Sequence, residues 1–240
     1  MGKYEIASLK EIPLFYSLTD EELHHISDKI FIKRFKKHEI ILSEEDTTQY
    51  MYIISSGKVK VVQATEDGKE ILLAMHQEGE FFGEMSLIDG KTSPATVIAT
   101  EDSIIAIISK KDFHLLINTQ KKLFENLLLI LCSRLRESWE KIQLLNLKNA
   151  SQRIKILLLM LSDKYGKKAA DGVTLSIKLT HQEIADMSGM ARETVTRVID
   201  RWQKDGEINI LKNRFIHLSP KFFQKDLTLP VDSYSAVSRD

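Results

Sequence analysis

Hydrophobic and polar residues follow different periods in different parts of the chain. From about residue 31 to residue 108 the apolar residues form short β-branched runs such as "YMYII", "KVKVV", "ATVIAT" and "SIIAII". Turn signals such as Ser55-Ser56-Gly57 and Asp89-Gly90 separate these runs. Several short strands at this spacing predict a small antiparallel barrel or jelly roll. Ahead of them, the capping box from Thr19 to Glu22 predicts a short helix.

Beyond a second capping signal at Ser109, the period lengthens to about three and a half residues. We expect one long helix with a mostly apolar seam. The seam occupies successive a and d positions of a heptad repeat: Leu128, Leu131, Leu135, Ser138, Ile142 and Leu145. The seam could pack on the chain's own barrel, but it continues past any length that a small barrel covers. We therefore favour pairing with a second copy, since a symmetric dimer is the commonest arrangement. Ser138 is polar, and a polar residue there sets the register or faces a ligand.

A second domain is predicted after Asn149 to Ser151, where the heptad pattern stops and a new apolar helix, "QRIKILLLMLSDKYG", begins. A capping box from Thr180 to Glu183 opens a short helix, and Gly189 supplies a turn, where positive φ is cheap for glycine. The next helix is followed by two short strands, "EINIL" and "RFIHLS", joined around Lys212-Asn213. This order of elements predicts a helix-turn-helix with a wing.

The helix after Gly189 has two chemically different faces. Its apolar face is expected to be Val195, Val198, Ile199 and Trp202, and its polar face Glu193, Thr196, Arg197, Arg201 and Lys204. Arginine can donate twice to guanine, glutamate can accept from cytosine, and threonine can touch a thymine methyl or a phosphate. Charged helix faces are more often salt-bridged surfaces in solvent. Because the turn and the wing accompany it, we expect this helix to read DNA with Arg192, Glu193, Thr196 and Arg197.

Composition narrows the possible partners. The chain has 240 residues, a length that favours two domains, and 34 basic residues balance 34 acidic ones. A nucleic-acid surface must therefore arise from local charge asymmetry. The single cysteine, Cys132, excludes an internal disulfide and a cysteine-ligated iron–sulfur cluster. No apolar run is long enough for a membrane span and the first residues lack a signal-peptide pattern, so we expect a cytoplasmic protein without a membrane partner.

Residues 10 to about 222 resemble the CRP/FNR family of bacterial transcription regulators, and "RETVTR" is similar to its catabolite activator branch. The resemblance implies an α+β fold with four parts: an effector-binding antiparallel β-roll (jelly roll) over residues 1–115, a dimerisation helix over 116–148, a winged helix-turn-helix over 149–224 and a tail over 225–240. It also implies a non-enzymatic homodimer that binds double-stranded DNA and works with RNA polymerase.

By this resemblance Arg192, Glu193 and Arg197 read a half-site similar to TGTGA, which is repeated in inverted order about one helical turn away. Ala191 departs from the family pattern, in which serine often stands at this position. Losing a serine N-cap costs on the order of 1 kcal/mol.

The same resemblance places an effector pocket in the β-roll. Its lining is implied to be Gly83, Glu84, Met85, Ser86 and Ser93, together with Ser138 and Trp139 of the long helix. In members that bind cyclic AMP an arginine-serine pair neutralises the phosphate, whereas here the equivalent place reads Ser93-Pro94. A buried phosphate without its cation is poorly compensated. We therefore expect an effector other than cyclic AMP, unless Lys91 supplies the charge.

The residues leave other effectors and functions open. Haem needs an axial ligand, for which His38, His76 and His114 are the candidates. The resemblance also allows a small organic acid as effector, because other members of the family sense such acids, and Cys132 is a candidate thiol sensor. A different class of function is a cyclic-nucleotide-binding regulatory module whose C-terminal helices contact protein. A metal-dependent enzyme of the cupin type needs several converging histidines, which the strands do not supply, so no metal site is expected.

Overall fold

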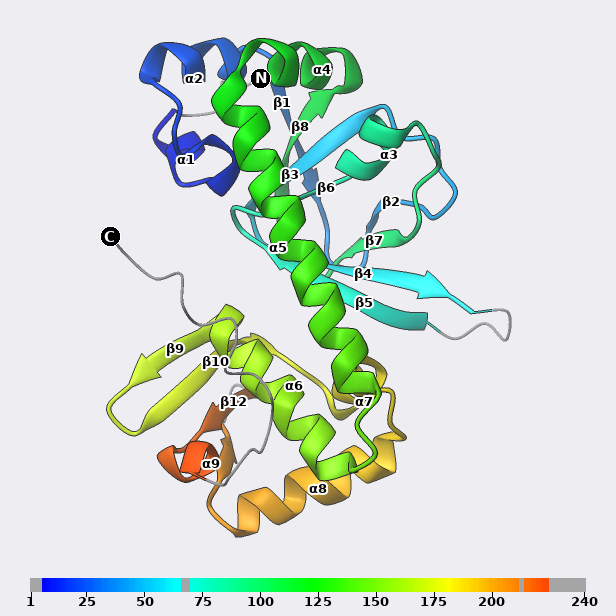
Figure 1. Cartoon of the computed structure of the whole chain (residues 1–240), viewed down its shortest axis with the longest axis vertical. Coiled ribbons are helices and arrows are strands. Elements are labelled where there is room, and N and C mark those ends of the chain that lie inside the picture. Colours follow the sequence, from blue (N-terminus) through cyan, green and yellow to red (C-terminus); the bar gives the residue numbers. More distant parts are fainter. Residues whose placement is uncertain (1–5, 66–69, 212–213, 225–240) are drawn as a thin grey trace. The chain divides into compact units, whose positions relative to one another are not determined.

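The computed structural model describes residues 6–65, 70–211 and 214–224, and the chain divides into two compact units, Met1–Ile142 and Gln143–Asp240 (Figure 1). The predicted turn at Lys212-Asn213 and the tail over 225–240 lie outside the described residues.

The described part of the N-terminal unit contains two four-stranded antiparallel sheets, with strand orders β1-β8-β3-β6 and β2-β7-β4-β5. The strands are β1 (Ile30–Phe35), β2 (Ile40–Leu42), β3 (Tyr50–Ser56), β4 (Lys58–Ala64), β5 (Glu70–Gln77), β6 (Phe81–Phe82), β7 (Thr96–Ala99) and β8 (Ser103–Ser109). The accompanying helices are α1 (Ile6–Lys10), the 3-10 helix η1 (Pro13–Phe15), α2 (Asp20–Ser27), α3 (Glu84–Asp89), α4 (Lys110–Thr119) and α5 (Lys121–Leu145). From Gln143 on, α5 belongs to the C-terminal unit. The predicted antiparallel roll is confirmed.

The middle parts of strands β3 and β8 are continuously apolar because both of their faces are buried. On β3, Met51 and Ile53 join a core with the helices, whereas Tyr52 and Ile54 join the core inside the roll. Strand β8 divides in the same way, with Ile108 facing the helices and Ile107 facing the interior. Successive side chains of a strand point to opposite faces, so two cores require a continuous apolar run. This is the physical reason for the runs "YMYII" and "SIIAII".

The long helix starts later than the range 116–148 that we expected for it. Residues 116–119 belong to α4, and α5 begins at Lys121 after Gln120, which has a non-helical backbone. Leu123 and Leu127 of α5 are buried against the helical core. Figure 1 shows α5 passing along the sheets of its unit.

The predicted seam of α5 is only partly covered by its own chain. Leu128, Leu135, Ile142 and Leu145 are exposed, with exposed fractions of 52% for Leu135 and 58% for Ile142. Leu131 instead is half-buried against the helical core. These exposed members form an apolar stripe along α5.

The described part of the C-terminal unit combines four helices with one antiparallel sheet of order β11-β12-β10-β9. Its elements are α6 (Ala150–Tyr165), β9 (Gly166–Ala169), β10 (Gly172–Lys178), α7 (His181–Ser188), α8 (Arg192–Lys204), β11 (Ile208–Ile210), β12 (Phe215–Leu218) and α9 (Pro220–Gln224). The two predicted wing strands are β11 and β12. The β9–β10 hairpin is an additional element that the sequence reading missed.

Helices α6, α7 and α8 pack around a small apolar core. Ile154, Leu158, Ile184, Val195 and Ile199 are all fully buried, and the ring of Trp202 meets Phe222 edge to face with centroids 5.6 Å apart. This core fixes the direction of α8 within its unit. No helix in the described part of the chain has the length and apolar composition needed to cross a bilayer.

Candidate nucleic-acid interface and effector pocket

The turn between α7 and α8 has the local chemistry that the sequence predicts. Thr180 and Glu183 form both bonds of a capping box at the start of α7. Gly189 ends α7 with φ of 60°, a left-handed conformation that costs glycine little. Helix α8 then starts after Ala191, whose methyl side chain caps no backbone N–H group. The start of α8 is thus open at its N-terminus.

Helix α8 is buried on one face and exposed on the other. Val195, Val198, Ile199 and Trp202 are buried, as expected. The outward side chains surround a surface hollow of about 650 Å³, which is lined by Arg192, Glu193, Thr196, Arg197, Asp200, Arg201 and Lys204. All four residues predicted to read DNA therefore lie together on one accessible face, called the reading face below.

The reading face is not a salt-bridged surface. Over residues 6–65, 70–211 and 214–224, no carboxylate pairs with Arg192 or Arg197, and Glu193 has no basic partner. Farther along the helix, Arg201 Nη2 donates to Ser151 Oγ at 2.7 Å. Arg192, Glu193 and Arg197 thus keep their donors and acceptors available for an external ligand.

One contact on the reading face was not foreseen from the sequence. His181 Nδ1 lies 2.9 Å from Thr196 Oγ1, so the first residue of α7 holds the hydroxyl of a predicted DNA-reading residue. The two positions are 15 residues apart, and no local periodicity indicates their contact. The Thr196 hydroxyl therefore already has a hydrogen-bond partner before any ligand binds.

In the β-roll, the structure brings Gly83 and Glu84 together with a residue that sequence reasoning missed. Glu84 is only 3% exposed, and its carboxylate accepts a hydrogen bond from Arg134 Nη1 of α5 at 2.8 Å. Arg134 Nη2 donates to Phe81 O at 2.6 Å, and the guanidinium lies 4.5 Å from the centre of the Phe81 ring. The buried charge of Glu84 is therefore compensated within the chain.

Gly83 is required where it stands. Its φ is 85°, and a Cβ added there would lie 2.9 Å from Tyr50 O and 3.0 Å from Tyr52 Cδ2. A side chain at this position would clash with β3 and strain the backbone. The glycine thus allows α3 to start close against the sheet and holds Glu84 inside the roll.

The remaining predicted pocket residues are divided between buried and exposed positions. Ser86 and Ser93 are buried, and Ser93 Oγ donates to Ala95 O at 2.8 Å within its own loop. Met85 is exposed over 54% of its surface, and Lys91 is also exposed. The hydroxyl of Ser93 is therefore already used by its own loop.

The two predicted residues of α5 lie on its exposed side. Ser138 Oγ donates to Arg134 O at 2.9 Å, within its own helix, and the Trp139 side chain is 56% exposed. The neighbouring Lys141 instead reaches the roll, where its Nζ donates to Leu73 O at 2.9 Å and to Leu72 O at 3.3 Å. Burial lowers the pKa of this amine, because the charged form loses water. Lys141 therefore attaches α5 to β5 through backbone carbonyls.

The histidines named as haem candidates have different surroundings. His76 Nδ1 lies 3.4 Å from Glu80 Oε2, His114 stacks edge to face beside Phe113, and His38 has a positive φ of 70°. Cys132 is exposed on α5. Across the described ranges, His, Cys, Asp and Glu side chains form no group of three that could hold a metal ion.

Two family models match the two units. The model described as "Cyclic nucleotide-binding domain" matches residues 32–120, and the model described as "Crp-like helix-turn-helix domain" matches residues 152–223. The first range covers the roll from β1 to the end of α4, and the second covers α6 to α9.

Similar proteins over most of the chain are transcription regulators. The cyclic AMP receptor protein of Thermus thermophilus is 30% identical over 202 residues, which are 84% of this chain and 90% of that protein. The global nitrogen regulator of a Nostoc species is 27% identical and covers 82% of this chain and 89% of that protein. Such relatives are not enzymes, which confirms the expectation that this chain is not one.

Solved structures agree on the fold. FixK2 from Bradyrhizobium japonicum superposes with a TM-score of 0.72 at 21% identity, covering 83% of this chain and 98% of that one. A transcriptional regulator of the CRP/FNR family from Thermus thermophilus gives a TM-score of 0.62 at 26% identity, covering 80% of this chain and 94% of that one. The roll, the long helix and the C-terminal helix-turn-helix are shared.

Proposed function

Because this chain belongs to the CRP/FNR family of transcription regulators, we propose that it binds inverted-repeat DNA as a ligand-responsive homodimer, with half-sites similar to TGTGA. The reading face carries this proposal. Arg192, Glu193 and Arg197 are exposed on a helix whose other face is buried, and none of them is paired among the described residues. Arginine can donate two hydrogen bonds to guanine O6 and N7, and glutamate can accept one from cytosine N4.

The exposed stripe of α5 supports the homodimer. Leu128, Leu135, Ile142 and Leu145 repeat with the spacing of a coiled-coil seam, and each of them is exposed. Leu131 lies at the edge of this stripe, because its side chain is partly buried against the core of its own chain. Two copies paired along this stripe carry two reading faces related by a twofold axis, which is the symmetry of an inverted repeat.

We further propose that a small-molecule effector other than cyclic AMP binds at the roll. The Thermus relative is named for cyclic AMP, but here Ser93-Pro94 offers no cation, and the Arg134 guanidinium already bonds Glu84. The effector acts by favouring one orientation of the reading faces, through its different affinities for two conformations. In this account the protein works in the cytoplasm, with RNA polymerase as a partner.

Fluorescence anisotropy tests the DNA-binding proposal. The full-length protein is titrated onto a duplex that carries TGTGA in inverted repeat and onto a scrambled duplex, each with and without cyclic AMP. The proposal expects tighter binding to the repeat that does not depend on cyclic AMP. Tight binding that appears only with cyclic AMP would overturn the effector proposal, and equal affinity for both duplexes would count against these half-sites.

The dimer is tested by placing a charge in the stripe. Leu135→Asp should yield a monomer in light scattering and weaken binding to the repeat by more than about 100-fold, since a buried unpaired carboxylate is costly. Leu129→Asp is the matched control, because Leu129 is 70% exposed and lies beside the predicted seam. If both variants stay dimeric, the stripe is not the interface.

A further inference from the structure

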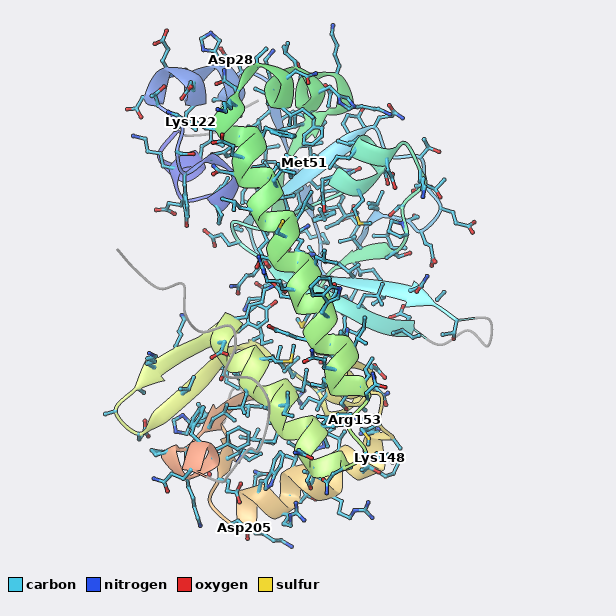
Figure 2. The ribbon with its side chains drawn as sticks, in the orientation of Figure 1. Asp28, Met51, Lys122, Lys148, Arg153 and Asp205 are labelled. Carbon is cyan, nitrogen blue, oxygen red and sulfur yellow. The ribbon has the colours of Figure 1, made fainter. Side chains whose placement is uncertain are left out.

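Arg153, in the first turn of α6, bonds to two parts of the chain that are distant in sequence. Its Nε donates to Leu147 O at 3.0 Å, and its Nη2 donates to the same oxygen. Its Nη1 donates to Ser188 O at 3.2 Å and, more weakly, to Gly189 O at 3.4 Å. Figure 2 shows Arg153 at the beginning of α6. One guanidinium therefore joins the link after α5 to the turn before α8.

The carbonyl oxygens of Ser188 and Gly189 are acceptors without a partner inside α7. Ser188 is the last residue of α7 and Gly189 is its C-cap, and the last carbonyls of a helix have no partner within it. They also carry the negative end of the helix dipole, which favours a cation. Among the described residues no carboxylate pairs with Arg153, so its acceptors are backbone carbonyls. The planar fork of arginine can serve two carbonyl groups at once, which a lysine amine does less well.

A second contact joins the same two segments. A Cβ added at Gly189 would lie 3.1 Å from Leu145 Cδ2 and 3.7 Å from Arg153 Nη1. The last residue of α5 therefore packs directly against the turn that precedes α8. Side-chain packing and hydrogen bonding together fix this turn to the end of α5 within the C-terminal unit.

We infer that Arg153 is a positioning residue for DNA recognition. By holding the turn before α8 on the end of the dimerisation helix, it sets the angle at which each reading face meets DNA, and hence the half-site spacing that the dimer accepts. The inference rests on the proposed homodimer, because spacing matters only when two reading faces bind one duplex. A loose joint lets the dimer tolerate several spacings, whereas a stiff joint selects one.

The test compares affinity for three inverted repeats: one with the spacer that the wild-type protein prefers, one shortened by about 2 base pairs and one lengthened by about 2, shifts well below a helical turn. The variants are Arg153→Gln, Arg153→Lys and, as a control, Lys148→Gln. Lys148 is exposed and lies in the same link, so its variant removes the same charge without touching the carbonyls. Dissociation constants come from anisotropy, and thermal unfolding is followed in parallel.

Wild type and Lys148→Gln should keep the same spacer preference. Arg153→Gln should bind the preferred spacing about tenfold more weakly, the order expected for lost charged hydrogen bonds, and should lose most of the difference between spacings. The affinity and the spacer preference of Arg153→Lys should lie between those of the wild type and those of Arg153→Gln. If Arg153→Gln does not fold, Arg153→Lys still gives the ratio between the affinities for the preferred spacing and for the altered spacings.

Two results would overturn the inference in distinguishable ways. If the Arg153 variants weaken binding to all three duplexes by one factor, or not at all, while the wild-type preference persists, Arg153 has at most a structural role. If the wild-type protein itself shows no spacer preference, the proposed reading by a homodimer fails, and the inference fails with it.

Discussion

The reading face of α8 and the proposed effector site of the β-roll use their polar side chains in opposite ways. On α8, Arg192 and Arg197 have no partner among the described residues. In the roll, Glu84 is bonded to Arg134, and Ser93 is bonded to its own loop. A surface meant for DNA keeps its donors free, because phosphates and base edges supply the acceptors. An effector that binds at the proposed site in the roll must therefore either displace Arg134 or bind beside it.

The largest expected loss of stability comes from breaking the Glu84–Arg134 ion pair. Arg134→Met leaves the Glu84 carboxylate buried without a partner and should lower the free energy of unfolding by about 3 kcal/mol. Glu84→Gln combined with Arg134→Met should cost less than Arg134→Met alone, because no buried charge remains. Urea unfolding of the full chain measures both.

Arg136→Met is the control for that series, since Arg136 is exposed two residues further along α5. It should leave stability nearly unchanged. If Arg136→Met and Arg134→Met lower the free energy of unfolding equally, the Glu84–Arg134 pair does not stabilise the roll. The polar side chains of the roll would then not differ from those of the reading face in this respect.

Helices α4 and α8 differ in how their first N–H groups are satisfied. Ser109 caps α4 by accepting from Asp112 N at 3.1 Å, whereas Ala191 leaves the start of α8 uncapped. Ala191→Ser should therefore stabilise the C-terminal unit by about 1 kcal/mol, the usual contribution of a serine N-cap. Thermal unfolding measures the change, with Ala191→Gly as a comparison that should gain less. No gain in the serine variant would show that the start of α8 is satisfied in another way.

The smallest effect is a pH dependence at the start of α4. The Ser109 hydroxyl, and secondarily the Lys29 amine, hold the pKa of Asp112 below its ordinary value of 3.8. A carboxyl with a lowered pKa contributes stability above that ordinary value and loses it as the pH falls through the folded-state pKa. Asp112→Asn should cost about 0.5 kcal/mol at pH 7, and the difference from wild type should vanish near pH 2. A difference independent of pH would exclude the ionised carboxyl as its source.

Local patterns were sufficient to predict most elements of the fold. The capping boxes at Thr19 and Thr180 and the left-handed Gly189 all appear as expected. The β9–β10 hairpin was missed, although Asp171-Gly172 is a turn signal, because its strands are short and directly follow α6.

The contacts that organise the two sites could not be read from the sequence. Arg134 reaches Glu84 across 50 residues, and Arg153 reaches Ser188 across 35. Periodicity describes which face of a helix is buried, but it does not say which distant carbonyl or carboxylate an arginine will meet. Such contacts depend on how the elements pack, so only the structure supplies them.

The most direct test of the account removes the two free arginines of the reading face. Arg192→Ala with Arg197→Ala should weaken binding to the TGTGA inverted repeat by at least about 100-fold and abolish the preference over scrambled DNA, since each bidentate arginine contact contributes about 1–3 kcal/mol. Lys167→Ala with Lys168→Ala, on the exposed β9 strand, removes the same charge and should keep that preference. Equal preference in both double variants would contradict the claim that α8 reads DNA, and would favour a module that contacts protein.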